Sequence, residues 1–238
     1  MAGTLFLIPN SLGPGDLEPV IPAPVRAQTA GLDCFIAENA KTARAFLKVV
    51  AATHPLPTAL QQIDIRELNV NTPASALPSL LAPLLTGKDV GLLSEAGVPA
   101  VADPGADLVR LAHQSGIRVR PLVGPSSLLL ALMASGLNGQ SFAFHGYLPT
   151  DADARAARIR QLEQRSRQEK QTQILIETPY RNDAMLQALA THCAGSTLVC
   201  VATDLTLDTE AVRTTSAQQW KQEIAAGKMP EFRKKPTV

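Results

Sequence analysis

Short apolar runs alternate with longer amphipathic stretches through the first half of the chain. The short runs are rich in Leu, Ile and Val, and the longer stretches repeat their apolar residues at helical spacing. Such patterns predict buried strands and helices, respectively. The predicted strands are 4–8, 32–37, 62–65, 90–93 and 118–123, and the predicted helices are 25–30, 40–51, 73–85 and 103–115. Their alternation predicts a mainly parallel sheet with helices on both faces.

The pattern changes after Gly139. Strand-like runs now follow one another more closely, and a long charged helix begins at a cap formed by Thr150 or Asp151. The predicted strands are 141–145, 172–177, 197–202 and 211–215, and the predicted helices are 151–170, 184–193 and 216–226. Closely spaced strands favour antiparallel pairs in a mixed sheet. We therefore predict an α/β protein of two domains, a mainly parallel α/β domain over 1–123 and a mixed-sheet α+β domain over 124–238.

Two nearly uncharged loops follow predicted strands. Ser94–Gly105 follows the strand at 90–93, and Gly124–Ser127 follows the strand at 118–123. The carboxyl ends of the strands form the usual ligand-binding edge of an open α/β sheet. Asp103 precedes Pro104, so we expect its side chain to cap the helix that begins there, and we prefer this role over a catalytic one.

Several short motifs occur in order along nearly the whole chain. They are Gly3–Pro9, Ala37–Asn39, Ser94–Gly105, Gly124–Ser127, Phe144–Pro149 and Glu177–Arg181. Together they resemble the tetrapyrrole methylase family of S-adenosylmethionine (SAM) methyltransferases, and within it the cytidine 2′-O-methyltransferases of small-subunit ribosomal RNA. The resemblance implies the two-domain tetrapyrrole-methylase-like fold, SAM held between the domains, S-adenosyl-L-homocysteine as product, and a homodimer.

The resemblance also implies which residues contact SAM. A pocket for this cofactor needs apolar walls and backbone hydrogen bonds, which the two neutral loops can offer. The loop at Gly124–Ser127 adds hydroxyl groups and free N–H groups at a helix start. Without the resemblance, Ser126 is an ordinary helix cap. The implied cofactor-binding residues are Leu12, Gly97, Val98, Pro99, Val101, Ala102, Ser126, Ser127 and Thr178.

Two acids are candidate catalytic residues. A ribose hydroxyl is a poor nucleophile at neutral pH, so a nearby base would assist methyl transfer. Glu38 follows the predicted strand at 32–37 and matches the glutamate of the family, and Glu95 stands where the family usually has aspartate. A glutamate at a helix start is equally well explained by the helix dipole, so both interpretations of Glu38 remain open.

Basic residues beside these acids are candidates for contact with RNA phosphates. Lys41 and Arg44 recur at helical spacing, which also suits an ordinary solvated face. The stretch that begins at Glu38 departs from the family pattern Glu-Asp-Thr-Arg-x-Thr-Arg, and this leaves the acceptor open. The resemblance implies a substrate contact for Arg181, for which an ion pair with Glu177 is the structural alternative.

Composition narrows the function further. The 238 residues are 45% hydrophobic and 18% charged with a net charge of +1, which suits a large core and neither demands nor excludes nucleic acid. The three cysteines lack zinc or redox spacing and are expected to be buried reduced thiols, and the histidines form no metal constellation. We predict neither a signal peptide nor a membrane span, and expect a cytoplasmic protein.

We therefore predict a SAM-dependent methyltransferase that modifies a ribose 2′-hydroxyl, with ribosomal RNA or the small ribosomal subunit as its partner. Two alternatives remain open. One is methylation of another acceptor, such as a tetrapyrrole or a small molecule. The other is a SAM-binding or RNA-binding protein with little catalytic activity.

Overall fold

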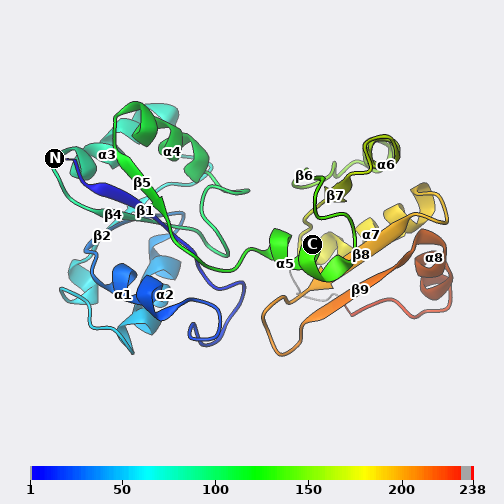
Figure 1. Cartoon of the computed structure of the whole chain (residues 1–238), viewed down its shortest axis with the longest axis horizontal. Coiled ribbons are helices and arrows are strands. Elements are labelled where there is room, and N and C mark those ends of the chain that lie inside the picture. The colour runs from blue at the N-terminus through cyan, green and yellow to red at the C-terminus, as the bar shows by residue number, and fades with distance from the viewer. Residues whose placement is uncertain (1, 232–236) are drawn as a thin grey trace. The chain divides into compact units, whose positions relative to one another are not determined.

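The computed structural model describes residues 2–231 and 237–238. These residues form two compact units, Met1–Ser126 and Ser127–Val238, each described by itself below (Figure 1). The sequence placed the boundary slightly earlier, after Val123. The loop that follows belongs to the first unit because Gly124 packs on Pro9, so closely that a Cβ atom on this glycine would lie 2.2 Å from Pro9 Cγ.

A parallel sheet forms the centre of the N-terminal unit (Figure 1). Its strand order is β3-β2-β4-β1-β5, and every neighbouring pair is parallel. Leu93 lies beside both Ile8 and Ala37, so β1, β2 and β4 end at one edge. The strands are β1 (Thr4–Ile8), β2 (Cys34–Ala37), β3 (Asp64–Glu67), β4 (Val90–Leu93) and β5 (Arg118–Pro121). The mainly parallel sheet predicted from the sequence is confirmed.

Helices cover both faces of this sheet. They are α1 (Ala23–Ala30), α2 (Ala40–Ala51), α3 (Leu77–Leu85) and α4 (Gly105–Gln114). Phe6 and Phe35 pack with residues of α1 and α2, whereas Leu5 and Cys34 pack with residues of α3 and α4. Successive strand residues point to opposite faces, so one strand contributes to both cores.

Several predicted boundaries of the N-terminal unit are wrong by a few residues. The strands predicted at 32–37 and 118–123 are Cys34–Ala37 and Arg118–Pro121, and the helix predicted at 25–30 is Ala23–Ala30. The strand predicted at 62–65 begins at Asp64, because Leu60–Gln62 forms a 3-10 turn in which the Gln62 N–H donates to Ala59 O. The helix predicted at 73–85 opens with the 3-10 turn Ala74–Ala76. The fourth helix begins at Gly105, after Pro104.

The C-terminal unit contains two separate strand pairs. β6 and β7 are parallel, and β8 and β9 are antiparallel. The elements are α5 (Ser127–Ser135), β6 (Phe142–Phe144), α6 (Ala152–Glu169), β7 (Thr172–Ile174), α7 (Asn182–His192), β8 (Leu198–Thr203), β9 (Ala211–Ser216) and α8 (Ala217–Ala225), with a 3-10 turn at Pro179–Arg181. The prediction of antiparallel pairs is wrong for β6 and β7, because α6 connects them as a crossover helix.

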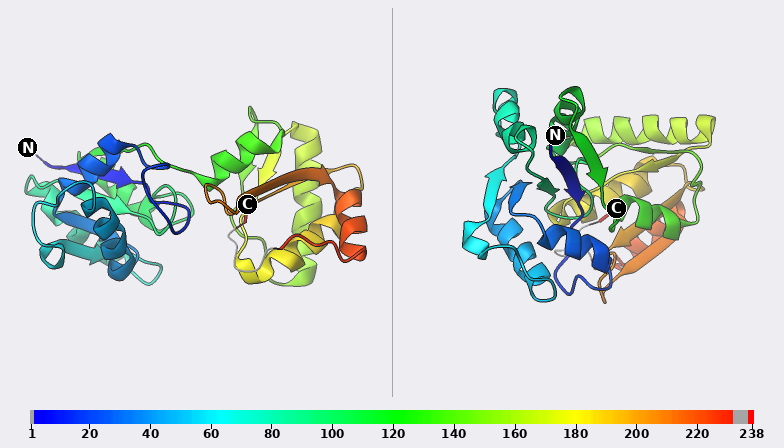
Figure 2. Two further views of the ribbon diagram at one scale, coloured as in Figure 1. Left: turned by 90° about the horizontal axis from the view of Figure 1, so that it is seen from below. Right: turned by 60° about the vertical axis from the view of Figure 1, so that its left-hand side comes forward.

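Two apolar clusters hold this unit together. Trp220 is buried among residues of α7, β8 and α8, and its indole N–H donates to Val199 O at 3.0 Å. Ile159 of α6 packs with Met185 of α7 and with Leu148 in the second cluster. Asp151 caps α6 by accepting a hydrogen bond from Ala154 N, as one of the two predicted caps. Figure 2 shows α6 and the β8–β9 ribbon from two further directions.

The structure tests the prediction that the three cysteines are buried thiols. All three cysteines are free thiols, but only Cys34 is fully buried, so the prediction of buried thiols is wrong for Cys193 and Cys200, which are half-buried. Among residues 2–231 and 237–238, no helix is long and apolar enough to cross a membrane.

Candidate functional site

Three loops of the N-terminal unit meet beyond the carboxyl ends of β1, β4 and β5. Asn10 N donates to Gly97 O at 2.8 Å, and Gly97 N donates back to Asn10 O at 3.2 Å. A Cβ atom on Gly97 would lie 3.3 Å from Leu12 Cδ2 and 3.6 Å from Pro125 O. The predicted cofactor residues Leu12 and Gly97 are therefore neighbours, and the Gly124–Ser127 loop lies beside them.

Asn10 ties the first two loops together. Its side-chain amide donates to Ser94 O at 3.2 Å and to Glu95 O at 3.1 Å. Ser94, which is buried, donates its hydroxyl to Gly97 O at 2.9 Å. These contacts hold the Ser94–Gly105 loop against the end of β1, although Asn10 carries none of the sequence signals that pointed to the site.

The loop after β4 has an unusual backbone. Gly97, Ala100 and Ala102 all have positive φ, at 70°, 65° and 60°. Alanine rarely adopts this left-handed conformation, and such residues cluster at functional sites when the surroundings hold them in place. Asp103 supplies part of that support, because its Oδ1 accepts hydrogen bonds from Ala100 N at 2.9 Å and from Gly105 N at 2.7 Å.

The predicted cofactor residues of this loop differ in exposure. Pro99 is buried, Val98 is half-buried, and Val101 and Ala102 are exposed. Ser126 is half-buried at the end of the N-terminal unit. The loop thus presents apolar side chains and a backbone with left-handed residues. No charged side chain lies between Ala96 and Ala102.

Three acids gather near the same edge of the sheet. Burial raises the pKa of Glu38 above its usual value, and the charges of Asp103 and Glu95 raise it further. Burial also raises the pKa of Asp103, although its hydrogen bonds from Gly105 N and Ala100 N oppose the rise. The structure brings both predicted catalytic acids together and adds Asp103, for which we predicted only a capping role.

Asp103 also confirms part of that capping prediction. Its carboxylate accepts from Gly105 N, which is the first residue of α4. The helix itself begins at Gly105, two residues after the start of the predicted range 103–115 and one residue after Pro104. Asp103 therefore holds a helix start and contributes negative charge near Glu38 at the same time.

The start of α2 is fastened to this acidic group. Asn39 caps the helix through hydrogen bonds from Lys41 N and Thr42 N. Thr42 Oγ1 donates to Glu95 Oε1 at 2.5 Å, which links α2 to the loop after β4. Thr42 is a contact that sequence reasoning missed, because nothing local to the residue marks a partner in a distant loop.

The predicted RNA-contact residues lie on α2. Lys41 is exposed, and Arg44 is half-buried with its Nη1 donating to Ala40 O at 3.4 Å. Lys48 is exposed further along the helix. Lys41 therefore leaves its charge available at the start of α2, close in sequence to the cap at Asn39.

The remaining predicted residues belong to the C-terminal unit. Ser127 begins α5 and is half-buried. Thr178 donates its N–H and its hydroxyl to Glu177 Oε1 at 2.7 and 3.2 Å. Arg181 forms an ion pair with Glu177 Oε2 at 3.0 Å and donates to Leu148 O at 2.9 Å. The ion pair that we kept as the structural alternative for Arg181 is present.

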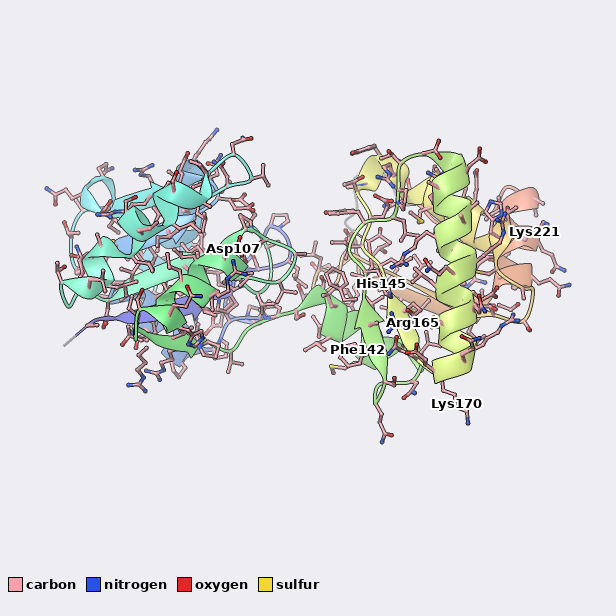
Figure 3. All side chains as sticks on the ribbon, turned by 90° about the horizontal axis from the view of Figure 1, so that it is seen from above. Asp107, Phe142, His145, Arg165, Lys170 and Lys221 are labelled. Atoms are coloured by element: carbon pink, nitrogen blue, oxygen red, sulfur yellow. The ribbon has the colours of Figure 1, made fainter. Side chains whose placement is uncertain are left out.

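The histidine nearest the recognised motifs takes part in a polar network of the C-terminal unit. His145 Nε2 lies 2.6 Å from Gln173 Oε1, and its Nδ1 lies 3.3 Å from Arg158 Nη2 of α6. His145 is labelled in Figure 3. Within the described part of the chain, no group of three His, Cys, Asp or Glu side chains could hold a metal ion.

Comparison with known proteins identifies the family. The model of the tetrapyrrole (corrin/porphyrin) methylases matches residues 11–220. The ribosomal RNA small subunit methyltransferase I of Xylella fastidiosa is 34% identical over 211 residues, which cover 88% of this chain and 71% of that protein. Its counterparts from Vibrio cholerae and Mesorhizobium japonicum are each 37% identical, over 56% and 65% of this chain. The matches span 45% and 51% of those two proteins, about half their length.

Solved structures agree on the fold. The methyltransferase CobJ matches 100% of this chain and 94% of its own with a TM-score of 0.60 and 17% identity. The cobalt precorrin-4 methyltransferase CbiF matches 98% of this chain and 93% of its own with a TM-score of 0.57 and 14% identity. At such identities the likeness concerns the fold alone. With the family model matching most of the sequence, the chain belongs to the tetrapyrrole methylase family of methyltransferases.

Proposed function

We propose that this chain transfers a methyl group from SAM to a ribose 2′-hydroxyl of ribosomal RNA. The observation that carries the proposal is the meeting of Leu12, Gly97 and Pro125 beside a glutamate whose pKa is raised. The relatives named ribosomal RNA small subunit methyltransferase I support RNA as the acceptor.

The residues present fit a SAM molecule. Gly97 is buried, and a Cβ atom there would lie only 3.3 Å from Leu12 Cδ2, so a glycine lets the loop after β4 pack closely on Leu12. Ala100 and Ala102 have left-handed backbone conformations, so the N–H and C=O groups around them do not follow helical or strand geometry. When bound, SAM supplies a methyl group already activated by its sulfonium. The wall formed by Val98 and Pro99 excludes water from the reacting atoms.

Glu38 is proposed as the base that accepts the proton of the acceptor hydroxyl. A base is most effective when its pKa lies near the working pH, and burial together with Asp103 and Glu95 moves the pKa of Glu38 in that direction. Thr42 holds Glu95 through its hydroxyl and thereby keeps this negative neighbour in place. Lys41 and Arg44 would contact phosphates of the acceptor strand.

Ser127 and Thr178 in the C-terminal unit complete the proposed set of cofactor contacts, with Arg181 as a substrate contact. We further propose a cytoplasmic homodimer. Exposed apolar side chains of the C-terminal unit support the proposal of a dimer, because such side chains are often covered by a partner. Among them are Leu129, Met133 and Tyr180, which are 50%, 78% and 84% exposed. Light scattering at tens of micromolar would give the mass of two chains, and the mass of one chain would overturn this part.

Calorimetry tests the donor site. The protein should bind SAM and S-adenosylhomocysteine, and Val98→Arg should abolish binding because it places a long charged chain in a neutral wall. Val70→Arg is the matched control, since Val70 is 87% exposed and lies in the same unit. Folded protein that gives no heat with either ligand would remove the proposal, as would unchanged binding by Val98→Arg.

A further inference from the structure

Asn10 lies just beyond the end of β1 and is half-buried beside the loop that follows β4. β1 and β4 are parallel neighbours, so the chain leaves both strands at the same edge of the sheet (Figure 1). The loop after β4 then turns back and forms an antiparallel bridge between Gly97 and Asn10. Asn10 thus contacts the loop of the proposed donor site without belonging to the sheet itself.

The side-chain amide of Asn10 uses both of its ends. Its nitrogen donates one hydrogen bond to Ser94 O and one to Glu95 O, and its oxygen accepts from Ser11 N at 2.8 Å. A backbone carbonyl only accepts and a backbone N–H only donates, so these three contacts fix which end of the amide is the nitrogen. A carboxylate of the same size could not replace it, because two oxygens would then face two carbonyl oxygens.

These hydrogen bonds fasten one end of a strained segment. Gly97, Ala100 and Ala102 have left-handed backbone conformations, which persist only where the surroundings hold them. Asn10 holds the residues that precede this segment, and Asp103 holds Ala100 N within it. The proposed apolar wall of Val98 and Pro99 therefore lies between the two sets of contacts.

We propose that Asn10 is a positioning residue of the donor site, whose side-chain amide keeps the loop after β4 in the shape that accepts SAM. This inference rests on the proposed function. Asn10 acts through the loop and needs no contact with the cofactor. Without the amide, only a fraction of the molecules keeps the binding shape, and the observed affinity falls by that fraction. Loss of two hydrogen bonds of ordinary strength corresponds to an affinity about ten- to hundredfold lower.

Two variants separate hydrogen bonding from side-chain volume. Asn10→Asp keeps the size of the side chain but places an oxygen against Ser94 O and Glu95 O. Asn10→Ala removes the side chain and leaves no repulsion. If the amide nitrogen matters, Asn10→Asp should bind the cofactor more weakly than Asn10→Ala, and both more weakly than the wild type. Asn71→Asp is the matched control, because Asn71 is an exposed asparagine of the same unit.

Calorimetry with S-adenosylhomocysteine measures the order of these affinities. This ligand lacks the positive charge of the sulfonium, so the carboxylate added by Asn10→Asp cannot compensate through charge attraction. Absence of binding by the wild type would remove the proposed donor site itself. Binding by the wild type with equal affinity in both Asn10 variants would overturn only the role of Asn10. A larger loss in Asn10→Ala than in Asn10→Asp would also overturn it, because side-chain volume would then be the cause.

Amide hydrogen exchange supplies a readout that a general loss of stability would not give. Gly97 N donates to Asn10 O, so its exchange reports the contact between loop and strand end. Exchange at Gly97 should be faster in both Asn10 variants and slow again at saturating S-adenosylhomocysteine, while β1 and β4 exchange as in the wild type. Unchanged exchange at Gly97 would overturn the proposal. Faster exchange throughout the sheet, or loss of the fold, would overturn it as well, because Asn10 would then stabilise the whole unit.

Discussion

Glu38 is the residue at which charge, burial and the proposed chemistry meet. Its pKa is raised first by burial and then by Asp103 and Glu95. We expect Glu38→Gln to keep the affinity for SAM and to slow methyl transfer by about 10²–10⁴-fold, the usual contribution of a general base. Single-turnover rates, measured beside calorimetry on the same variant, check this. Normal turnover by Glu38→Gln would reduce Glu38 to an acid at a helix start.

The same substitution has a predicted effect on stability. Because the pKa of Glu38 is higher in the folded than in the unfolded chain, the folded state binds the proton more readily, and the stability of the wild type rises as pH falls through that folded pKa. At neutral pH, Glu38→Gln removes a charge that the fold disfavours and should raise the melting temperature. The difference should shrink as the solution is acidified.

Melting curves over a pH series measure this effect. Asp107→Asn serves as the control, because Asp107 is an exposed acid on α4 of the same unit that pairs with Arg110 in the next turn. A Glu38→Gln variant that is less stable than the wild type at neutral pH would contradict the assignment of a strained, partly buried carboxylate.

For single residues, the sequence predicted which side chains belong to the site better than it predicted their contacts. Glu38, Glu95 and Gly97 are marked by their place after a strand, and the structure brings them to one edge. Asn10 and Thr42 could not be found in this way, because their roles come from hydrogen bonds across 85 and 53 positions of sequence. The raised pKa of Glu38 likewise depends on Asp103, which the sequence shows only as a cap.

At the scale of elements, β4 carries the loop on which the site depends. Gly91 lies in the middle of this strand, and a Cβ atom there would lie 2.6 Å from Ile8 Cδ1 and 2.7 Å from Phe35 Cδ1. Gly91→Ala should destabilise the N-terminal unit by about 1–3 kcal/mol through overpacking. Gly31→Ala is the control, because its Cβ would meet only ordinary contacts at 3.6 Å. Urea unfolding followed by circular dichroism measures the stability of both variants. Equal unfolding midpoints for Gly91→Ala and Gly31→Ala would contradict the close packing around Gly91.

The start of α2 makes a second prediction about an element. Replacing Lys41 and Arg44 together by Ala should leave SAM affinity unchanged and weaken RNA binding. Each lost phosphate contact should lower the slope of log affinity against log salt by about 0.7 on single-stranded RNA. Filter binding over a salt series measures this slope. The control variant, Arg110→Ala with Arg118→Ala, removes the same amount of positive charge from α4 and β5. An equal loss of RNA affinity in this control would mean that net charge, and not contact by Lys41 and Arg44, causes the effect.

The sequence predicted helices and strands well where the hydrophobic pattern of a segment fits only one kind of element. The runs 4–8 and 90–93 became β1 and β4 with the same bounds, because buried parallel strands are apolar throughout. Pairing was harder to predict. β6 and β7 are parallel because the long helix α6 returns the chain to the same end, and strand spacing alone suggested antiparallel partners.

At the scale of the whole molecule, the chain forms one unit with a parallel sheet and the loop site, and a second unit that contains two separate strand pairs. The alternation of strands and helices predicted the first unit, because each crossover in a parallel sheet needs a helix. The division of the second unit into the pairs β6–β7 and β8–β9 has no such signal, because the spacing of strands along the chain does not say which of them pair. The acceptor also lies beyond pattern reasoning, because the departures after Glu38 change the side chains that would meet it.

Transfer of tritium from labelled SAM to total RNA and small-molecule extracts, both from cells lacking the protein, tests the central claim most directly. The account predicts label in small-subunit ribosomal RNA, in a form that resists alkaline cleavage because the 2′-hydroxyl is blocked, and none with the Val98→Arg variant. Label found only in tetrapyrroles or other small molecules would contradict the RNA acceptor. Tight SAM binding without transfer to any extract would contradict the enzyme.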